Sequence, residues 1–159
     1  MNTRSLLVLA TLTLAACGQE TANDTSADAS AAEETGDAIL MDNPLLTDWD
    51  TPSGVPPFDR IRAEHYLPAL REGMRRERAE IESIVEDPAA PTFANTVEAL
   101  ERAGSSLERT ARVFYAVNAA HSDEVIRQTA KTIAPERSAH EDGILLNPAL
   151  FQRIDAVWQ

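Results

Sequence analysis

The feature that most constrains the fold is a run of apolar and small side chains in residues 93–118. Its members follow one another at alternating steps of four and three residues: Phe93, Val97, Leu100, Gly104, Leu107, Ala111, Phe114 and Asn118. This spacing places them on one face of an α-helix and is typical of a helix–helix seam. Thr92 is well suited to cap the helix N-terminus. Gly104 has no side chain, so a neighbouring backbone can approach closely there. Because glycine has a low helix propensity, a break in the helix at Gly104 is the alternative.

Three further segments carry helical signals. Residues 66–85 place Leu67, Leu70, Met74, Ile81, Ile84 and Val85 at three- and four-residue spacings, and Pro68 fits the first turn. Ser122 is expected to cap a helix with Ile126, Thr129, Ala130 and Ile133 on one face, and Asn147 with Pro148 opens another. Because alternating strand patterns and hairpin signals are absent from the sequence, we predict an all-α, antiparallel helical bundle with short connections.

Four arginines in the first of these segments, Arg71, Arg75, Arg76 and Arg78, each have an acidic neighbour in the sequence. The expected i, i+4 pairs are Glu72 with Arg76, Arg76 with Glu80, and Arg78 with Glu82. We interpret the cluster as a solvated, ion-paired helix face. A clamp for the carboxylate of a substrate is the alternative.

Residues 43–59 combine four prolines with large apolar side chains. Proline fixes φ and lacks a backbone N–H, so this segment is not a helix. We predict an extended strap that lies across the helices, with Trp49 and Phe58 as its aromatic anchors. An unpacked Pro-rich linker is the alternative.

Residues 1–17 have the pattern of a lipoprotein signal peptide. Arg4 precedes an apolar run over residues 6–16, which is too short to span a bilayer, and the run ends in the lipobox Leu14, Ala15, Ala16 and Cys17. Cys17 is the expected lipidation site, which predicts a periplasm-facing lipoprotein of the bacterial cell envelope, attached to a membrane through lipid. An ordinary signal peptide cut elsewhere is the alternative.

Residues 18–42 are rich in Ala, Ser, Thr, Asp and Glu, and we predict a disordered acidic tether. The net charge is −12, and the sequence has no basic residue between Arg4 and Arg60. This charge disfavours nucleic acid as a partner. A functional acidic tail that recruits a basic partner is the alternative to a solvated spacer.

The sequence contains three histidines, His65, His121 and His140, and one cysteine, Cys17. No two histidines have the i, i+4 spacing that would direct both rings toward one zinc ion. We therefore predict neither catalytic residues nor metal ligands in this chain, and we interpret the histidines as structural.

Four stretches nevertheless resemble the thimet oligopeptidase family of zinc metallopeptidases, most closely its peptidyl-dipeptidases. They are NPLLTDWDTPSGVPPFDRIRAEHYLPALREGM (43–74), PTFANTVEALERAGSSLERTARVF (91–114), NAAHSDE (118–124) and LNPALFQRIDAVW (146–158). The resemblance implies that residues 43–159 form the N-terminal wall of a clam-shaped helical metallopeptidase. Its deep channel would admit short peptides and exclude folded proteins.

The resemblance also implies that the full-length protein binds zinc and releases C-terminal dipeptides from short peptides. The family holds zinc with an HExxH helix and a more distant glutamate, and this chain lacks that motif. Because the last helical pattern runs to Gln159 without a capping signal, we expect the chain to be an N-terminal fragment that is inactive alone. A stand-alone lipid-tethered helical binding module without catalytic activity is the alternative.

Overall fold

The computed structural model describes residues 40–159, and all regular secondary structure in this part of the chain is helical. The all-α prediction is therefore confirmed. The elements are η1 (Pro52–Gly54), η2 (Ala63–His65), α2 (Tyr66–Val85), η3 (Phe93–Val97), α3 (Glu98–Arg102), α4 (Ser105–Ala120), α5 (Glu124–Leu145) and α6 (Pro148–Trp158). The predicted signal peptide and lipobox, and nearly all of the predicted acidic tether, lie outside the described residues.

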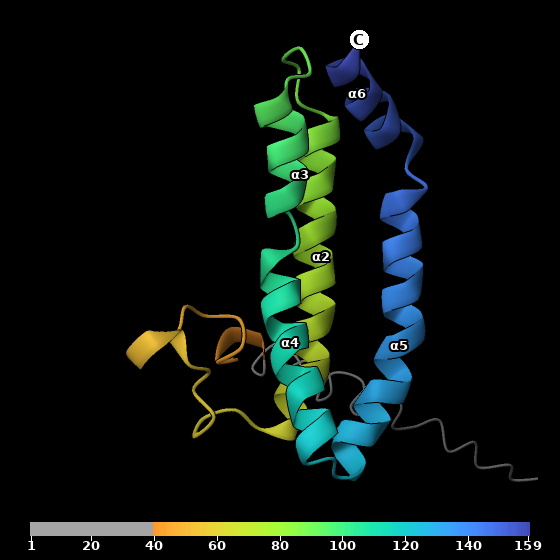
Figure 1. Cartoon of the computed structure of the whole chain (residues 1–159). Coiled ribbons are helices and arrows are strands. Elements are labelled where there is room, and N and C mark those ends of the chain that lie inside the picture. The colour runs from red at the N-terminus through yellow and green to blue at the C-terminus, as the bar shows by residue number, and fades with distance from the viewer. Residues whose placement is uncertain (1–39) are drawn as a thin grey trace, which may run out of the picture.

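The helices form an up–down–up arrangement (Figure 1). α2 runs the length of the molecule, α3 and α4 return beside it, and α5 runs back on the other side of α2. α6 lies at the far end, beside the end of α2, and carries the C-terminus. Consecutive long helices are thus antiparallel, as their short connections predict.

α2 packs closely against α4 because α2 has a glycine at their contact. A Cβ atom on Gly73 would lie 2.9 Å from the Cα of Leu107 and 3.1 Å from its Cβ. Gly73 is therefore the point of close backbone approach, a role that the seam pattern suggested for Gly104. Pro68 lies in the first turn of α2, where its missing N–H costs no helical hydrogen bond.

The seam of residues 93–118 is broken rather than continuous. Gly104 has a φ of +73°, a left-handed conformation that glycine adopts without strain, and it separates α3 from α4. Its N–H donates to Oε2 of Glu80 at 2.8 Å. Before the break, Thr92 caps the π-helical turn η3 as expected, since its Oγ1 accepts from the N–H of Asn95 at 3.2 Å. Phe93, the first seam residue, is exposed.

The caps of α5 and α6 can be compared with their predictions. Asp123, not Ser122, caps α5, because Oδ1 of Asp123 accepts from the N–H of Ile126 at 2.8 Å. The Ser122 hydroxyl instead donates to Oδ1 of Asn118 at 3.0 Å. The prediction for α6 is confirmed: Oδ1 of Asn147 accepts from two N–H groups of its first turn.

The strap packs against the helices mainly through its first residues. Asn43 and Leu45 are fully buried, and the Asn43 side-chain amide donates to the carbonyl of His65 at 2.9 Å. Trp49 packs on the same core, its Nε1 donates to the carbonyl of Pro44 at 2.9 Å, and the Arg109 guanidinium lies 4.8 Å from its ring centroid.

Phe58 was wrongly predicted as an anchor, since 54% of its surface is exposed. In the turn that it occupies, its neighbour Pro57 is buried instead. A Pro-Pro-Phe sequence does not indicate which of its apolar members faces inward.

The core has a large and a small part. The large cluster joins the strap, α2, α4 and α5 around Phe114, whose ring centroid lies 5.4 Å from that of Tyr66. The small cluster, where α2 meets α6, has only three buried members: Ile81, Ile84 and Leu150. The end of the molecule that carries α6 is therefore held by much less buried apolar surface.

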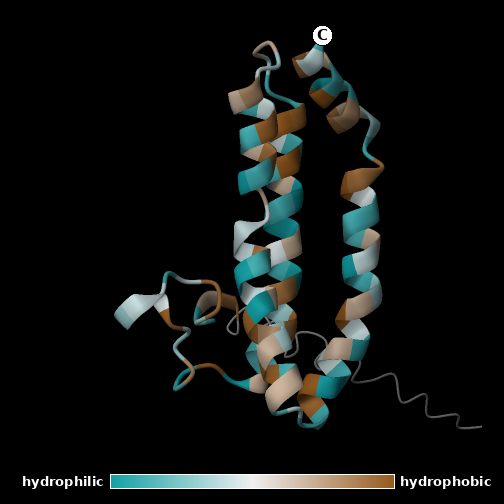
Figure 2. Cartoon of the chain, in the orientation of Figure 1, coloured by the Kyte–Doolittle hydropathy of each residue, from teal (hydrophilic) through white to brown (hydrophobic). Residues whose placement is uncertain are grey.

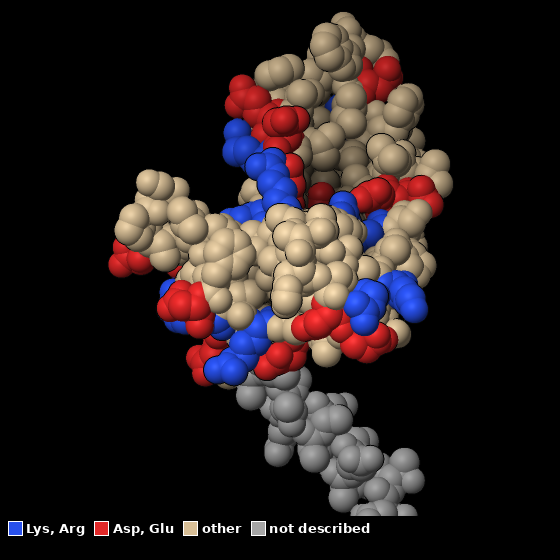
Figure 3. All heavy atoms as spheres, turned by 60° about the horizontal axis from the view of Figure 1, so that its bottom comes forward, with Lys and Arg blue, Asp and Glu red and all other residues tan. Residues whose placement is uncertain are grey.

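The surface near the α4–α5 connection carries charges of both signs. Figure 3 shows Lys and Arg intermingled with Asp and Glu around an uncharged central area. Across residues 40–159, no helix combines the length and hydrophobicity needed to cross a bilayer.

Candidate functional site

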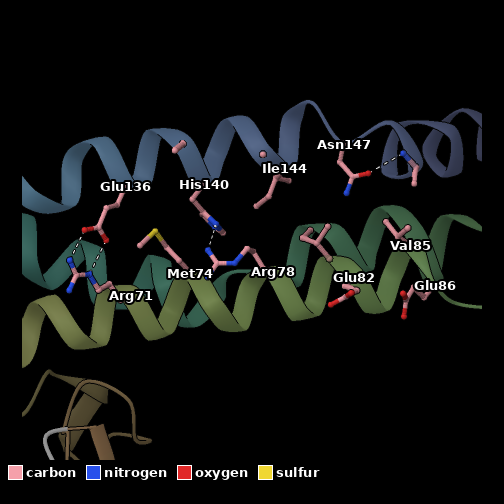
Figure 4. A pocket seen from close by; sticks show the side chains of 14 residues that line it. Arg71, Met74, Arg78, Glu82, Val85, Glu86, Glu136, His140, Ile144 and Asn147 are labelled. Atoms are coloured by element: carbon pink, nitrogen blue, oxygen red, sulfur yellow. Dashed lines mark hydrogen bonds and ion pairs between the residues drawn. The ribbon is translucent and has the colours of Figure 1, made fainter. Parts of the chain in front are cut away.

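The candidate site is a groove of about 940 Å³ between α2 and α5, closed at one end by the start of α6. Figure 4 shows side chains from α2 and α5 facing each other across it. Its apolar lining includes Met74, Ile81, Val85 and Ile144. Charged side chains of both signs line the rest of the groove.

An ion pair joins the two walls at the end of the groove farther from α6. The Arg71 guanidinium donates twice to the Glu136 carboxylate, from Nε at 2.9 Å and from Nη2 at 2.6 Å. Hydrogen bonding to Arg71 lowers the pKa of Glu136, and the same bond raises the pKa of Arg71. This bidentate pair joins α2 and α5 at this level.

A buried histidine links the walls at the middle of the groove. Nε2 of His140 lies 2.7 Å from Oε2 of Glu77, and Nδ1 lies 3.3 Å from Nη1 of Arg78. Arginine has donors only, so Nδ1 must accept and the ring proton lies on Nε2, which donates to Glu77. Both ring nitrogens of His140 are thereby occupied, and neither is free to bind a metal or to take a proton from a substrate.

The other two histidines also have structural positions. Nδ1 of His65 accepts from the N–H of Arg62 at 3.1 Å at the start of η2, and His121 is the exposed residue that ends α4. Within residues 40–159, no group of three or more His, Cys, Asp or Glu side chains is placed to hold a metal ion. These residues therefore do not fit the zinc that the family resemblance implies.

The groove can hold a ligand by shape and charge. Its apolar walls suit the apolar face of an extended or helical peptide, with Arg71 and Arg78 toward one end and Glu82 and Glu86 toward the other. Among the side chains that line it, none forms a nucleophile with an adjacent base. The arrangement therefore supports binding rather than covalent catalysis.

The arginine cluster is paired, but largely with other partners than those predicted. The pair of Glu72 with Arg76 is confirmed at 2.8 Å, and Arg75 shares the same carboxylate at 2.7 Å. Arg78 contacts His140 instead of Glu82, and Glu80 accepts from Gly104 instead of from Arg76.

Glu72 provides a test of this pairing. Hydrogen bonds from Arg75 and then Arg76 lower its pKa from 4.5 to about 2. A folded-state pKa below the unfolded value means that the carboxylate adds stability above about pH 4.5, and this stability is lost as the pH falls toward 2. We expect an NMR titration of the Glu72 carboxyl to have its midpoint near pH 2.

Replacing both arginines, Arg75→Gln and Arg76→Gln, should move that midpoint up toward 4.5. The matched control is Arg112→Gln, which removes an exposed arginine paired with Glu108 on another helix. If the midpoint of Glu72 in the parent chain were already near 4.5, the pairing seen here would not exist in solution.

Comparison with known proteins identifies peptidases as relatives. The chain is 48% identical over 120 residues to a dipeptidyl carboxypeptidase of Salmonella typhimurium and 42% identical over 117 residues to that of Escherichia coli. It is 32% identical over 101 residues to an organellar oligopeptidase A of Arabidopsis thaliana. Its relatives are peptidases. No family model matches the chain.

The matched region is a small part of each of these proteins. It covers 76% of this chain but 18% of the Salmonella protein, and 74% of this chain but 17% of the Escherichia coli protein. The chain thus spans less than a fifth of the length of the curated relatives it matches. The predicted resemblance to peptidases is therefore confirmed, since these homologues are peptidases.

Sequence reasoning missed the contacts that build the groove. The pairs Arg71 with Glu136 and Glu77 with His140 join residues 65 and 63 positions apart. A local pattern does not reveal such a pair. The one sequence feature that could have indicated such a contact was His140. A single histidine on a mostly polar helix often pairs with a residue from another element.

Proposed function

We propose that this chain is the N-terminal part of an exported zinc peptidyl-dipeptidase, which releases C-terminal dipeptides from short peptides. The observation that carries the proposal is the 48% identity over 120 residues to a protein named dipeptidyl carboxypeptidase. In such an enzyme, a bound zinc ion would polarise the water that attacks the peptide bond. Its ligands would come from parts of the polypeptide outside residues 40–159.

In this proposal the described helices supply one wall of the peptide channel. The supporting feature is the α2–α5 groove, whose walls are held apart by Arg71 with Glu136 and by Arg78 with His140. These contacts join the two helices at two levels of the groove. A channel of fixed width selects peptides by size without contributing a catalytic group.

The test uses the longest product of the gene. We expect it to release dipeptides from the C-terminus of a short unstructured peptide, and we expect a zinc chelator to abolish the release completely. Addition of Zn²⁺ after removal of the chelator should restore it. Product identification by mass spectrometry distinguishes dipeptide release from internal cleavage. Activity that survives exhaustive chelation would contradict the zinc assignment.

A stand-alone binding module is the second candidate, and the groove itself favours it. A volume of about 940 Å³ with apolar walls is of the size that binds peptides or small ligands. The genomic sequence after the codon for Gln159 separates the two candidates. An HExxH motif downstream supports the peptidase, whereas an immediate stop codon supports the module.

Membrane attachment through Cys17 is also part of the proposal, and it rests on the lipobox sequence. We expect Cys17→Ser to abolish incorporation of labelled palmitate and to move the protein from the membrane fraction to the soluble fraction, because two or three acyl chains are needed for firm anchoring. The control is Ser26→Ala in the acidic segment. Continued labelling of the Cys17→Ser protein would exclude lipidation at this position.

A further inference from the structure

Four large apolar side chains at one end of the molecule are exposed to solvent. Leu145 and Leu146, at the connection between α5 and α6, are each 79% exposed, and Phe151 and Trp158 of α6 are 67% and 74% exposed. Figure 2 shows hydrophobic residues at this end of α5 and along α6. We refer to these four side chains as the α6 surface.

α6 exposes large apolar side chains beside the face that it buries. Its inner face carries the buried Leu150 and Arg153, which hold it against the end of α2 and η3. Phe151 and Trp158 are seven residues apart, or about two turns, so they share one side of the helix, about 100° around the axis from Leu150. A surface helix normally keeps its outer face polar, and a group of exposed large apolar residues marks an interaction site.

The same end of the molecule has the smaller core, with three buried residues. Covering the α6 surface would therefore add apolar burial where the described helices have least of it. Asp155 is the charged side chain between Phe151 and Trp158 on this face, and its carboxylate already accepts from the Gln159 side chain at 2.6 Å. The surface thus suits a partner that is itself apolar.

We propose that the α6 surface docks an apolar face from the part of the same polypeptide that follows residue 159. This inference rests on the proposed function. The aligned region makes up 18% of the Salmonella relative, so more than four fifths of a protein of that length lies outside it. An apolar face within the same polypeptide has a high effective concentration at the α6 surface. It therefore binds there in preference to a second copy of the protein.

The experiment uses the longest product of the gene, with the photo-crosslinker p-benzoylphenylalanine in place of Phe151. Because Phe151 is exposed in the described part, the larger side chain fits without disturbing the inner face of α6. After irradiation, crosslinked peptides are identified by mass spectrometry at several protein concentrations. The control carries the crosslinker in place of Gln128, an exposed position on α5 beside the charged Glu124 and Arg127.

We expect crosslinks within one polypeptide, from position 151 to apolar residues beyond 159, with a yield that does not change on dilution. Crosslinks between two polypeptides that disappear on dilution would show a second copy as the occupant and overturn the proposal. A yield no higher than that of the Gln128 control would overturn it as well.

Dipeptide release by the same crosslinker-bearing protein keeps the two proposals apart. Activity without intramolecular crosslinks rejects the docking surface and supports the peptidase. Crosslinks without activity support the docking surface and reject the peptidase. As a second measurement, Phe151→Ser should lower the melting temperature of this product, whereas Gln128→Ser should leave it nearly unchanged.

Discussion

Replacing Gly73 with valine is expected to separate α2 from α4 and to lower the local free energy of unfolding by about 3 kcal/mol, a cost typical of severe overpacking. The obstacle is the Cα of Leu107, 2.9 Å from the position of a new Cβ, and a backbone atom moves only if the helix moves. Hydrogen exchange of the α2 and α4 amides measures this loss without requiring the whole polypeptide to unfold in one step.

Gly143→Val is the matched control for this prediction. Gly143 also lies inside a helix, but a Cβ there would meet no atom within 4 Å. Valine has a higher helix propensity than glycine, so the control should be neutral or stabilising by a few tenths of a kcal/mol. Equal effects of the two substitutions would show that helix propensity, and not the close approach of α2 and α4, governs the response.

Arg153→Met should release α6 from the connection between α2 and η3, at a cost of about 3 kcal/mol. Arg153 is only 9% exposed, and its guanidinium donates to the carbonyls of Asp87 at 2.8 Å and Ala89 at 3.2 Å. It also lies 3.1 Å from the Asp87 carboxylate. Methionine keeps much of the packing volume and removes all three contacts, so two carbonyls and the partly buried Asp87 carboxylate lose their donor.

The measurement for Arg153→Met is the exchange rate of amides in η3 and α6, which should rise, while amides in α4 should stay protected. The control is Arg102→Met, because Arg102 is exposed and its pair with Glu98 spans 3.6 Å. Surface pairs of this kind contribute little, so the control should change exchange by less than the equivalent of about 1 kcal/mol. Comparable effects of both substitutions would contradict the role of Arg153 as a buried clamp.

Arg153 and Gly73 also show where sequence reasoning stops. The apolar residues of α6, which are Leu150, Phe151, Ile154, Val157 and Trp158, do not reveal its inner face, and Arg153 lies on that face with its charge buried. Its partners at residues 87 and 89 form a connection that a periodicity argument treats only as a helix break. Gly73 carried no special signal, because a glycine inside a helical pattern does not reveal which helix will approach it.

The candidate site was predictable only in its separate parts. Arg71, Arg78 and His140 were all noted in the sequence, but only Arg78 was given a partner, its helical neighbour Glu82. The structure instead pairs Arg71 with Glu136 and His140 with Glu77. An ion pair with a residue one helical turn away competes with an ion pair across the groove. Buried or bidentate geometry favours the pair across the groove.

The sequence by itself determined the helical class, the start of α2, the caps at Thr92 and Asn147, and the kinship with peptidases. These features depend on residues within a few positions of one another, or on sequence similarity to known proteins, so they can be recognised without a structure. Only the tertiary structure decided the break at Gly104, the inward turn of Pro57 rather than Phe58, the groove between α2 and α5, and the exposed face of α6. Each of these depends on which distant segment comes to lie beside a residue, and that is set by how whole helices pack.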